Sequence, residues 1–424
     1  MTLLINLFFI SSNPIITNDA IVLGLLMGAL AFVFYTSQLQ SWSRFYKVVP
    51  PLLLCYFIPA LFNWPLNLVS PESSGLYFVS TRYLLPATLI FLCLSIDFAG
   101  LLALGSKSII MFLTAVFGVI IGGPIAFFLA TRAFPEIIPI DPADLWKGMS
   151  TIAGSWIGGG ANQTAMKEIY HVNDSLFGTM LVVDIIVANI WMGILLYGAS
   201  ISDKIDYKLK ADNSAIKRLE LTVSEFRKKV EKNPTTSELM ILMAVGFVGV
   251  GISHLLADIT LPIMEGHIDL LNSLNLTALN SSFFWLVFYS TTIGLLLSFT
   301  RARNLEGIGA SKWGSIFIYV LVATIGMKMH LGEVFSNPGL FLIGIIWMSV
   351  HVLLLVIVAY LIKAPFFFVA VGSQASIGGA ASAPIVASAF SPSLAPVGII
   401  MAVLGYALGT YGAILCAQIM ASIS

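Results

Sequence analysis

The sequence predicts an all-α integral membrane protein with an inverted repeat, in which each half has five transmembrane helices and one re-entrant hairpin. Of its 424 residues, 58% are hydrophobic and only 10% are charged, whereas a soluble domain carries about 25% charged residues. Apolar runs of about 20 residues, the length that crosses a hydrocarbon core of about 30 Å, recur along the chain. A glycine-rich motif also occurs twice within these apolar surroundings. These three observations define the predicted fold class.

The two copies of the glycine-rich motif lie 220 positions apart. The first is Ile157-Gly158-Gly159-Gly160-Ala161-Asn162, and the second is Ile377-Gly378-Gly379-Ala380-Ala381-Ser382. A Gly-Ser pair precedes each copy. Each glycine in a helix interior costs roughly 1 kcal/mol relative to alanine. We therefore expect each motif to break a membrane-embedded segment, and we expect the functional site to lie at the two breaks.

The two repeats have the same predicted plan. The first covers residues 1–199 and has a broken segment at 145–168, and the second covers residues 237–424 and has one at 364–388. The predicted spans of the first repeat are residues 20–36, 48–64, 82–104, 108–130 and 176–199. Those of the second repeat are residues 237–257, 283–300, 312–328, 339–362 and 396–421.

Residues 200–236 differ in composition from both repeats and form a charged connector between them. They include nine Lys or Arg and six Asp or Glu, with a helical pattern over residues 215–232. The mixture of acidic and basic residues is typical of a solvated helix, and a lipid-binding patch is the alternative.

The distribution of basic residues predicts that both broken segments enter and leave on the same side of the membrane. Lys and Arg near transmembrane helices favour the cytoplasmic side. If both segments are re-entrant, 16 of the 21 Lys and Arg residues lie in the cytoplasm. Nine of these belong to the connector and seven lie elsewhere. The seven are Arg44, Lys47, Lys107, Arg301, Arg303, Lys312 and Lys363. We therefore predict a cytoplasmic connector in a multi-pass protein of the cell inner (plasma) membrane.

Five crossings per half invert the second half relative to the first. The first hairpin then enters from outside and the second from inside, which is the design of secondary transporters with a site at the midplane. A segment of 24 residues can form two half-helices of about ten residues, each roughly 15 Å long, which reach the middle of the membrane and return.

The residues at the two tips suit the binding of a small solute and a cation. Glycines let a ligand approach the backbone closely, and a half-helix N-terminus favours an anion. Oxygen atoms of hydroxyl, amide and carboxyl groups suit Na⁺, the expected coupling ion. The predicted solute ligands are Ser155, Gly159, Gly160, Asn162, Gln163, Ser373, Gln374, Gly378, Gly379 and Ser382. The predicted ion ligands are Asn162, Thr164, Asp184, Asn189 and Ser376.

Structural alternatives exist for these residues. Small residues at the motifs can serve tight helix packing. An acidic residue inside a membrane span is a functional candidate, but Asp184 can also lie near the end of its span or pair with Lys167. For Lys328, at the end of a predicted span, we expect the long side chain to reach the membrane surface.

Other functional classes lack their signatures in this sequence. The sequence has no P-loop, no HExxH, no Gly-x-Ser-x-Gly and no metal-ligand spacing among its five histidines. The formal net charge is zero, which gives no sign of nucleic-acid binding. We therefore expect no enzyme activity, no catalytic residues, no cofactor or bound metal and no nucleic-acid partner.

The two motifs and the layout of the spans resemble a bacterial and plastid membrane family known as domain of unknown function 819. The matching residues are 157–165 and 372–379, and the resemblance covers nearly the whole chain. More distantly, the layout is similar to sodium/glutamate symporters and 2-hydroxycarboxylate transporters. That similarity implies an elevator mechanism, Na⁺ coupling and a small anionic solute. No basic residue lies at either tip, so helix dipoles or backbone N–H groups would hold an anion.

The sequence therefore predicts an ion-coupled secondary transporter for an amino acid, a peptide-like compound or an organic acid. A block that carries both hairpins would move against a scaffold, and we expect the scaffold to form a homodimer contact within the lipid bilayer. A passive channel is the first alternative, because two opposed re-entrant loops can also build a pore filter. A membrane enzyme or sensor is the second.

Overall fold

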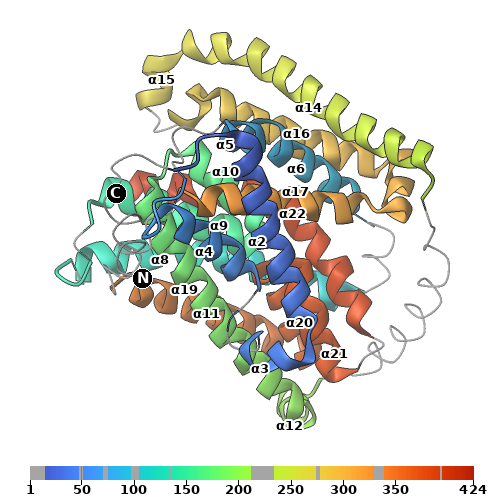
Figure 1. Ribbon diagram of the computed structural model, residues 1–424. Coiled ribbons are helices and arrows are strands. Elements are labelled where there is room, and N and C mark those ends of the chain that lie inside the picture. The colour runs from blue at the N-terminus through green and yellow to red at the C-terminus, as the bar shows by residue number, and fades with distance from the viewer. Residues whose placement is uncertain are drawn as a thin grey trace, which may run out of the picture.

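The computed structural model describes an all-helical chain (Figure 1). The described residues are 15–46, 49, 51–69, 75–96, 105–133, 135–138, 140–211, 234–273, 277–328, 339–391 and 394–424. Within these ranges the extended structure is limited to one isolated bridge, between Ile16 and Val69. The predicted helical section of the connector, residues 215–232, lies outside the described residues.

The helices follow the predicted order along both halves. The first half contains α2 (Asp19–Ser37), α4 (Pro51–Asn63), α5 (Leu76–Val79), the π-helical turn η3 (Ser80–Leu84), α6 (Leu85–Leu94), α8 (Ser106–Ala133), α9 (Pro142–Gly158), α10 (Gly160–Ile169) and α11 (Asp174–Ser200). The short helix α12 (Ser202–Leu209) begins the connector. The second half contains α14 (Thr236–Glu265), α16 (Ser282–Ser298), η5 (Arg301–Ile308), α17 (Ala310–Gly326), α19 (Gly339–Ile362), α20 (Phe366–Ile377), α21 (Gly379–Phe390) and α22 (Ala395–Ile423).

The membrane character of the chain is confirmed by its helices. Among the described residues, seven helices are long and apolar enough to cross a membrane, or eight if α16 and η5, which meet at 96°, form one span. The shorter helices α4 and α17 occupy two further predicted spans. The third predicted span begins at Leu76 and not at residue 82. Arg82 lies within this helix, and its guanidinium lies over the Phe283 ring, 4.3 Å from the centroid.

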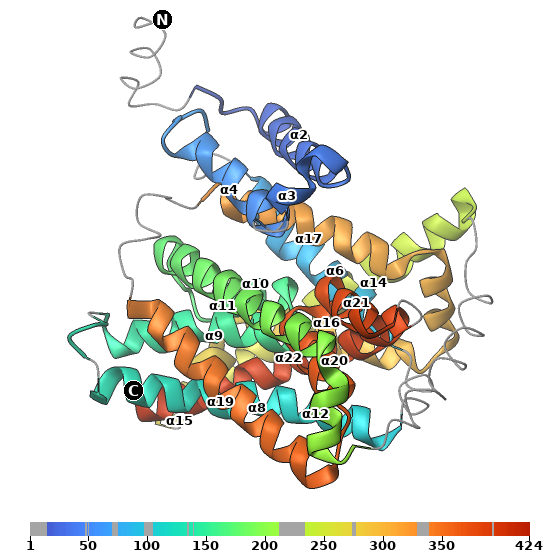
Figure 2. The same ribbon diagram turned by 90° about the horizontal axis from the view of Figure 1, so that it is seen from below.

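The helices pack into two groups that divide each half in the same way. One group, which we call the core group, contains α8 to α11 and α19 to α22. The other, the frame group, contains α2, α4, α5, α6, α14, α16 and α17. In Figure 2, α2, α4 and α17 lie on one side of the molecule, and α8, α9 and α19 lie on the other. The frame group therefore takes the first three spans of each half, and the core group takes the remaining segments.

Helices at equivalent positions in the two halves run antiparallel. In the pair α8 and α19, Gly118 packs against His351 and Gly122 packs against Trp347, so residue numbers rise along one helix as they fall along the other. The segments around α6 and α17 are also antiparallel. Gly314 packs against Leu92 at one end, and at the other end the ammonium of Lys328 lies 4.2 Å from the ring centroid of the earlier residue Tyr77.

Both glycine motifs break a helix and turn the chain back on itself. A Cβ added to Gly154 would lie 2.6 Å from the carbonyl oxygen of Asn162, and Gln374 Nε2 donates to Ser382 Oγ at 2.7 Å. In both pairs the residues are eight positions apart, which a straight helix would separate by about 12 Å. The turns lie at Gly159, with φ of 77°, and at Gly379, with φ of 58°. Glycine suits both turns because residues with a side chain rarely adopt positive φ.

The connector contacts the start of the second hairpin. The backbone N–H of Phe366, the first residue of α20, donates to Asp206 Oδ1 at 2.7 Å. Asp206 belongs to α12 and is buried, with 8% of its surface exposed. A carboxylate at a helix N-terminus satisfies a free N–H group and stabilises the helix through its dipole. The charged connector is thus fixed to the second hairpin at its first turn.

We expect the Asp206→Ala variant to lose about 1 kcal/mol of stability, because the first N–H of α20 loses its acceptor. Asp203→Ala is the matched control, since Asp203 is exposed on the same short helix. The measurement is the thermal unfolding midpoint in detergent, together with hydrogen–deuterium exchange of residues 366–370. Equal midpoints and equal exchange for the two variants would contradict the capping role.

Candidate functional site

The tips of the two hairpins touch inside the core group. Ser376 Oγ of α20 donates a hydrogen bond of 2.7 Å to the carbonyl oxygen of Trp156 in α9. Both residues are fully buried. The break after α9 frees carbonyl groups that a continuous helix would use, and one of them is thus satisfied by the second hairpin. The two glycine-rich tips therefore form one site, as expected from their matching positions.

Helix α22 lies against both tips through its glycines. A Cβ added to Gly405 would lie 2.6 Å from the carbonyl oxygen of Ile157 and 3.6 Å from that of Ala375. A Cβ on Gly409 would lie 2.5 Å from the Cα of Gly158. Backbone atoms cannot move aside as a flexible side chain can, so these positions of α22 require glycine. Close approach through small residues is a common device for packing helices in membranes.

Asn162 ties the first tip to α22 and to the frame group. Its Nδ2 donates to the carbonyl oxygens of Gly158, at 3.0 Å, and of Tyr406, at 3.2 Å. Its Oδ1 accepts from Thr410 Oγ1 at 2.6 Å, and the Thr410 and Thr291 hydroxyls are 3.0 Å apart. Because Thr291 belongs to α16, this chain of polar groups crosses from the core group to the frame group.

Asp184 is a buried acid held by both arms of the first hairpin. It is the eleventh of the 27 residues of α11 and is 5% exposed. Its two oxygens accept from Trp156 Nε1 of α9, at 2.6 Å, and from Gln163 Nε2 of α10, at 2.9 Å. Asp184 therefore lies neither at the end of its helix nor in a pair with Lys167. Lys167 pairs instead with Asp174, at 2.9 Å.

Tyr56, on α4, is a residue of this region that the sequence did not indicate. It is fully buried, and its hydroxyl has no hydrogen-bond partner among the described residues. The hydroxyl lies beside Thr164 and near Asp184, and Thr164 Oγ1 itself donates to the carbonyl oxygen of Gly160 at 3.0 Å. An aromatic residue within an apolar run gives no sequence signal, so only the contact with the hairpin identifies Tyr56.

Ser373 in the second hairpin belongs to a buried hydrogen-bond chain that also could not be predicted. Ser373 Oγ accepts from Trp191 Nε1 at 2.8 Å and lies 2.8 Å from His351 Nε2. The other ring nitrogen, His351 Nδ1, faces the carbonyl oxygen of Ala115 at 3.0 Å and must donate to it. Nε2 therefore accepts from the serine hydroxyl. The chain connects α20 to α11, α19 and α8, so Ser373 already has protein partners.

Gln374 brings an unused acceptor to the second tip. Its side chain is 2% exposed. Nε2 donates to Ser382 Oγ, whereas Oε1 has no hydrogen-bond partner among the described residues. A Cβ on Gly378 would collide with both of these side chains. A buried acceptor without a donor is unusual in a folded protein and is a candidate position for a ligand N–H or O–H group.

Eleven of the fourteen predicted site residues fall into three sets, and Thr164, Ser373 and Gln374 are described above. Ser155, Asn162, Gln163 and Asp184 gather at the first tip, where Ser155 also lies beside the Asp184 carboxylate. Gly159, Gly160, Gly378, Gly379, Ser376 and Ser382 form the turns and their contacts. Asn189 is half-buried on α11, and its Nδ2 donates to the carbonyl oxygen of Ile185 within the same helix, at 2.7 Å.

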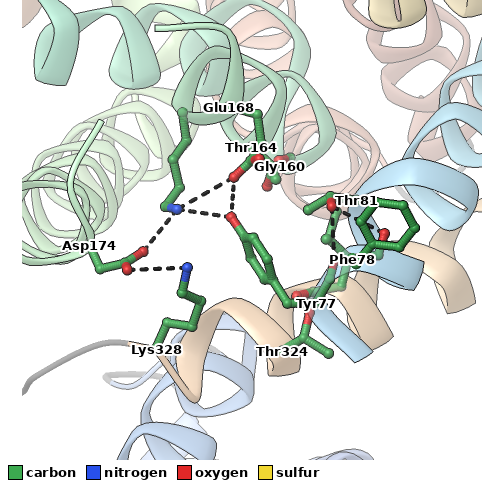
Figure 3. Close-up of polar contacts among 11 residues, drawn as sticks. Tyr77, Phe78, Thr81, Gly160, Thr164, Glu168, Asp174, Thr324 and Lys328 are labelled. Atoms are coloured by element: carbon green, nitrogen blue, oxygen red, sulfur yellow. Dashed lines mark hydrogen bonds and ion pairs between the residues drawn. The ribbon is translucent and has the colours of Figure 1, made fainter. Parts of the chain in front are cut away.

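A second polar cluster lies where α10 and α11 meet the frame group (Figure 3). Lys328 Nζ lies 3.4 Å from Asp174 Oδ2 and over the ring of Tyr77, and its side chain is 25% exposed. The sequence did not indicate these two contacts, and the extension of Lys328 to the membrane surface stays a prediction. Among the described residues, no group of three or more His, Cys, Asp or Glu side chains has the geometry of a metal site.

We expect Gly409→Ala to destabilise the protein by roughly 1–3 kcal/mol, since the added methyl group would force α22 and α9 apart. Gly251→Ala is the matched control, because a Cβ at this exposed position of α14 has no atom within 4 Å. Thermal unfolding of purified protein in detergent measures the difference. A Gly409→Ala midpoint equal to that of Gly251→Ala would contradict the close packing of α22 on the first tip.

Comparison with known proteins gives a membrane family without an assigned activity. Residues 24–423 match the model of the family described as "Protein of unknown function (DUF819)". A curated relative, the uncharacterized membrane protein YjcL of Bacillus subtilis (strain 168), is 23% identical over 354 residues. The alignment covers 81% of this chain and 83% of the relative.

Proposed function

The chain belongs to the DUF819 family, whose description assigns no activity, and we propose from its own geometry that it is an ion-coupled secondary transporter of a small polar or anionic solute. The observation that carries this proposal is the meeting of two broken helices beside a buried acid. Ser376 joins the second tip to Trp156 of the first, and Trp156 also binds Asp184. Broken helices at membrane depth are found where protein or a solute pathway covers the freed backbone.

The helix ends at the tips suit a solute that carries both an anionic group and a hydrogen-bond donor. Helices α10 and α21 begin at the tips, and their N-termini favour a negative charge. Helices α9 and α20 end there, and their C-termini favour a positive charge. The unpaired Oε1 of Gln374 can accept from an N–H or O–H group. Amino acids, peptide-like compounds and organic acids have this combination of groups.

The division into two groups supports an elevator mechanism. Both hairpins belong to the core group, whereas the first three spans of each half form the frame group. The antiparallel arrangement of α8 and α19 supports an inverted repeat. In the proposed mechanism the core group carries the solute across the membrane against the frame group. The frame group would supply the homodimer contact, in a plasma membrane protein whose connector is cytoplasmic.

The coupling ion is either Na⁺ or a proton, and the groups around Asp184 favour the proton. Sodium requires several oxygen ligands. The Ser155 hydroxyl beside the carboxylate offers one, but both Asp184 oxygens already accept N–H groups from Trp156 and Gln163. An indole N–H donates only and cannot bind a cation. A proton needs no additional ligands, so it can neutralise this carboxylate without rearrangement of the hairpin. Na⁺ remains the expectation from the resemblance to sodium symporters.

We expect Asp184→Asn to lower gradient-driven uptake roughly tenfold or more, since hydrogen bonds to a charged group are worth about 1.5–3 kcal/mol. Exchange of solute across the membrane without a gradient should persist, because the hairpin tips remain. The measurement is uptake of labelled amino acids, dipeptides and organic acids into proteoliposomes under a Na⁺ gradient or a pH gradient. Ser200→Ala is the control, because Ser200 is exposed at the end of the same helix.

Two results would contradict the proposal. Uptake by the wild-type protein that depends on neither gradient would exclude ion coupling and favour a passive channel. Asp184→Asn uptake equal to that of Ser200→Ala would exclude Asp184 as the coupling residue. If Asp184→Asn loses the uptake that a pH gradient drives and keeps the uptake that a Na⁺ gradient drives, the coupling ion is the proton. The opposite result would identify Na⁺.

A further inference from the structure

A charged cluster outside the glycine tips connects the core group to the frame group (Figure 3). The core group contributes Lys167 and Glu168 at the end of α10 and Asp174 at the start of α11. The frame group contributes Tyr77 of α5 and Lys328, which follows α17. The cluster contains two ammonium groups and two carboxylates, so its formal charge is balanced.

Lys167 lies at the centre of this cluster. Its side chain is 5% exposed, and its Nζ lies 2.9 Å from Asp174 Oδ1, 3.5 Å from Glu168 Oε1 and 2.9 Å from the Tyr77 hydroxyl. The Tyr77 hydroxyl accepts a hydrogen bond from this ammonium group. The two carboxylates form ion pairs with it, although Asp174 Oδ1 has no hydrogen-bond partner among the described residues. A buried lysine is stable in its charged form only with such partners. Two of the three oxygens belong to the core group itself.

Lys328 and Tyr77 of the frame group make the contacts that cross to Asp174 and Glu168 of the core group. Lys328 Nζ lies 3.4 Å from Asp174 Oδ2 and 4.2 Å from the ring centroid of Tyr77. The Tyr77 hydroxyl also donates to Glu168 Oε1. If the groups separate, Lys167 keeps Asp174 and Glu168 as partners. Lys328, whose side chain is already 25% exposed, can then turn toward solvent.

This division of contacts suits a junction that opens and closes. No buried lysine is left without a carboxylate when the groups part, so the large penalty of an unpaired buried charge is avoided. When the groups meet, an ion pair, a hydrogen bond and a cation–π contact form together. The predicted topology puts the end of α10, the start of α11 and the end of α17 on the external side of the membrane.

We propose that Lys328, Asp174, Tyr77 and Glu168 form a latch that holds the core group against the frame group at the external side in one end state of the transport cycle. The inference rests on the proposed transport function, because a latch is needed only if the two groups move. It assigns to these residues a conformational role that is separate from solute or ion binding at the tips.

Hydrogen–deuterium exchange of the whole protein in detergent tests the latch without transport. We expect Lys328→Met to raise the exchange of residues 165–176 roughly fivefold, the upper value for a partly exposed ion pair. Lys328→Arg keeps the charge and should restore wild-type exchange within about twofold. Lys312→Met is the matched control, because Lys312 is an exposed lysine at the other end of α17. Exchange of residues 165–176 in Lys328→Met equal to that in Lys312→Met would overturn the proposal.

Cross-linking tests whether the latch must open. Cysteines replacing Asp174 and Lys328 are joined by a short bifunctional thiol reagent in proteoliposomes, and cysteines replacing Asp144 and Lys147 serve as the control within one helix. The native Cys55, Cys93 and Cys416 are buried. We expect the link between 174 and 328 to stop uptake until the reagent is cleaved by reduction, and the link between 144 and 147 to leave uptake unchanged. Full uptake with the 174–328 link intact would overturn the latch.

The two experiments separate the latch from the proposed function. A wild-type protein that transports no solute of the panel would contradict the proposed function, while the exchange experiment would still decide whether Lys328 holds the two groups together. Normal exchange in Lys328→Met with intact gradient-driven uptake would contradict the latch alone.

Discussion

A broken helix can remain inside a membrane only if protein groups or a water-filled cavity satisfy the peptide groups that the break sets free. The chain breaks a helix at Gly159 and again at Gly378 and Gly379. Around the first break, the carbonyl of Trp156 accepts from Ser376 of the second hairpin, and that of Gly158 accepts from Asn162. Since unsatisfied backbone groups in hydrocarbon cost several kcal/mol each, each hairpin stabilises the position of the other. The packing of α22 follows from the same requirement, because its glycines let it approach both tips.

The two hairpins differ in how many of their polar groups are occupied. At the first tip, Asn162 and Asp184 have their hydrogen-bonding atoms engaged by protein partners. At the second tip, Gln374 keeps a free acceptor, and on the frame side Tyr56 has a hydroxyl without a partner. Buried polar atoms are nearly always bonded in folded proteins. The free Oε1 of Gln374 is therefore the first position at which to look for solute or ion density, whereas the Tyr56 hydroxyl lies beside Thr164.

The chain buries charge in two different ways. Asp184 is held by neutral N–H donors and has no basic partner among the described residues, so its charge can be changed by a proton or a cation alone. Lys167 is surrounded by carboxylates and a phenol, and its charge is permanently balanced. Under the proposed transport function, the first arrangement suits a group that gains and loses a ligand. Under the same proposal, the second suits a contact that stays charge-balanced when the core and frame groups separate.

The sequence by itself determined the membrane character, the order of the helices and the two breaks. These features depend on hydrophobic length and on the conformational freedom of glycine, which are local properties of the chain. The sequence also indicated Asp184, because an acid in an apolar run is conspicuous. It did not indicate Tyr56, Trp191, His351 or Thr410, nor the contacts of Lys328 with Asp174 and Tyr77. The contacts of these residues join segments far apart in the chain, and only the tertiary structure decides which distant side chains meet.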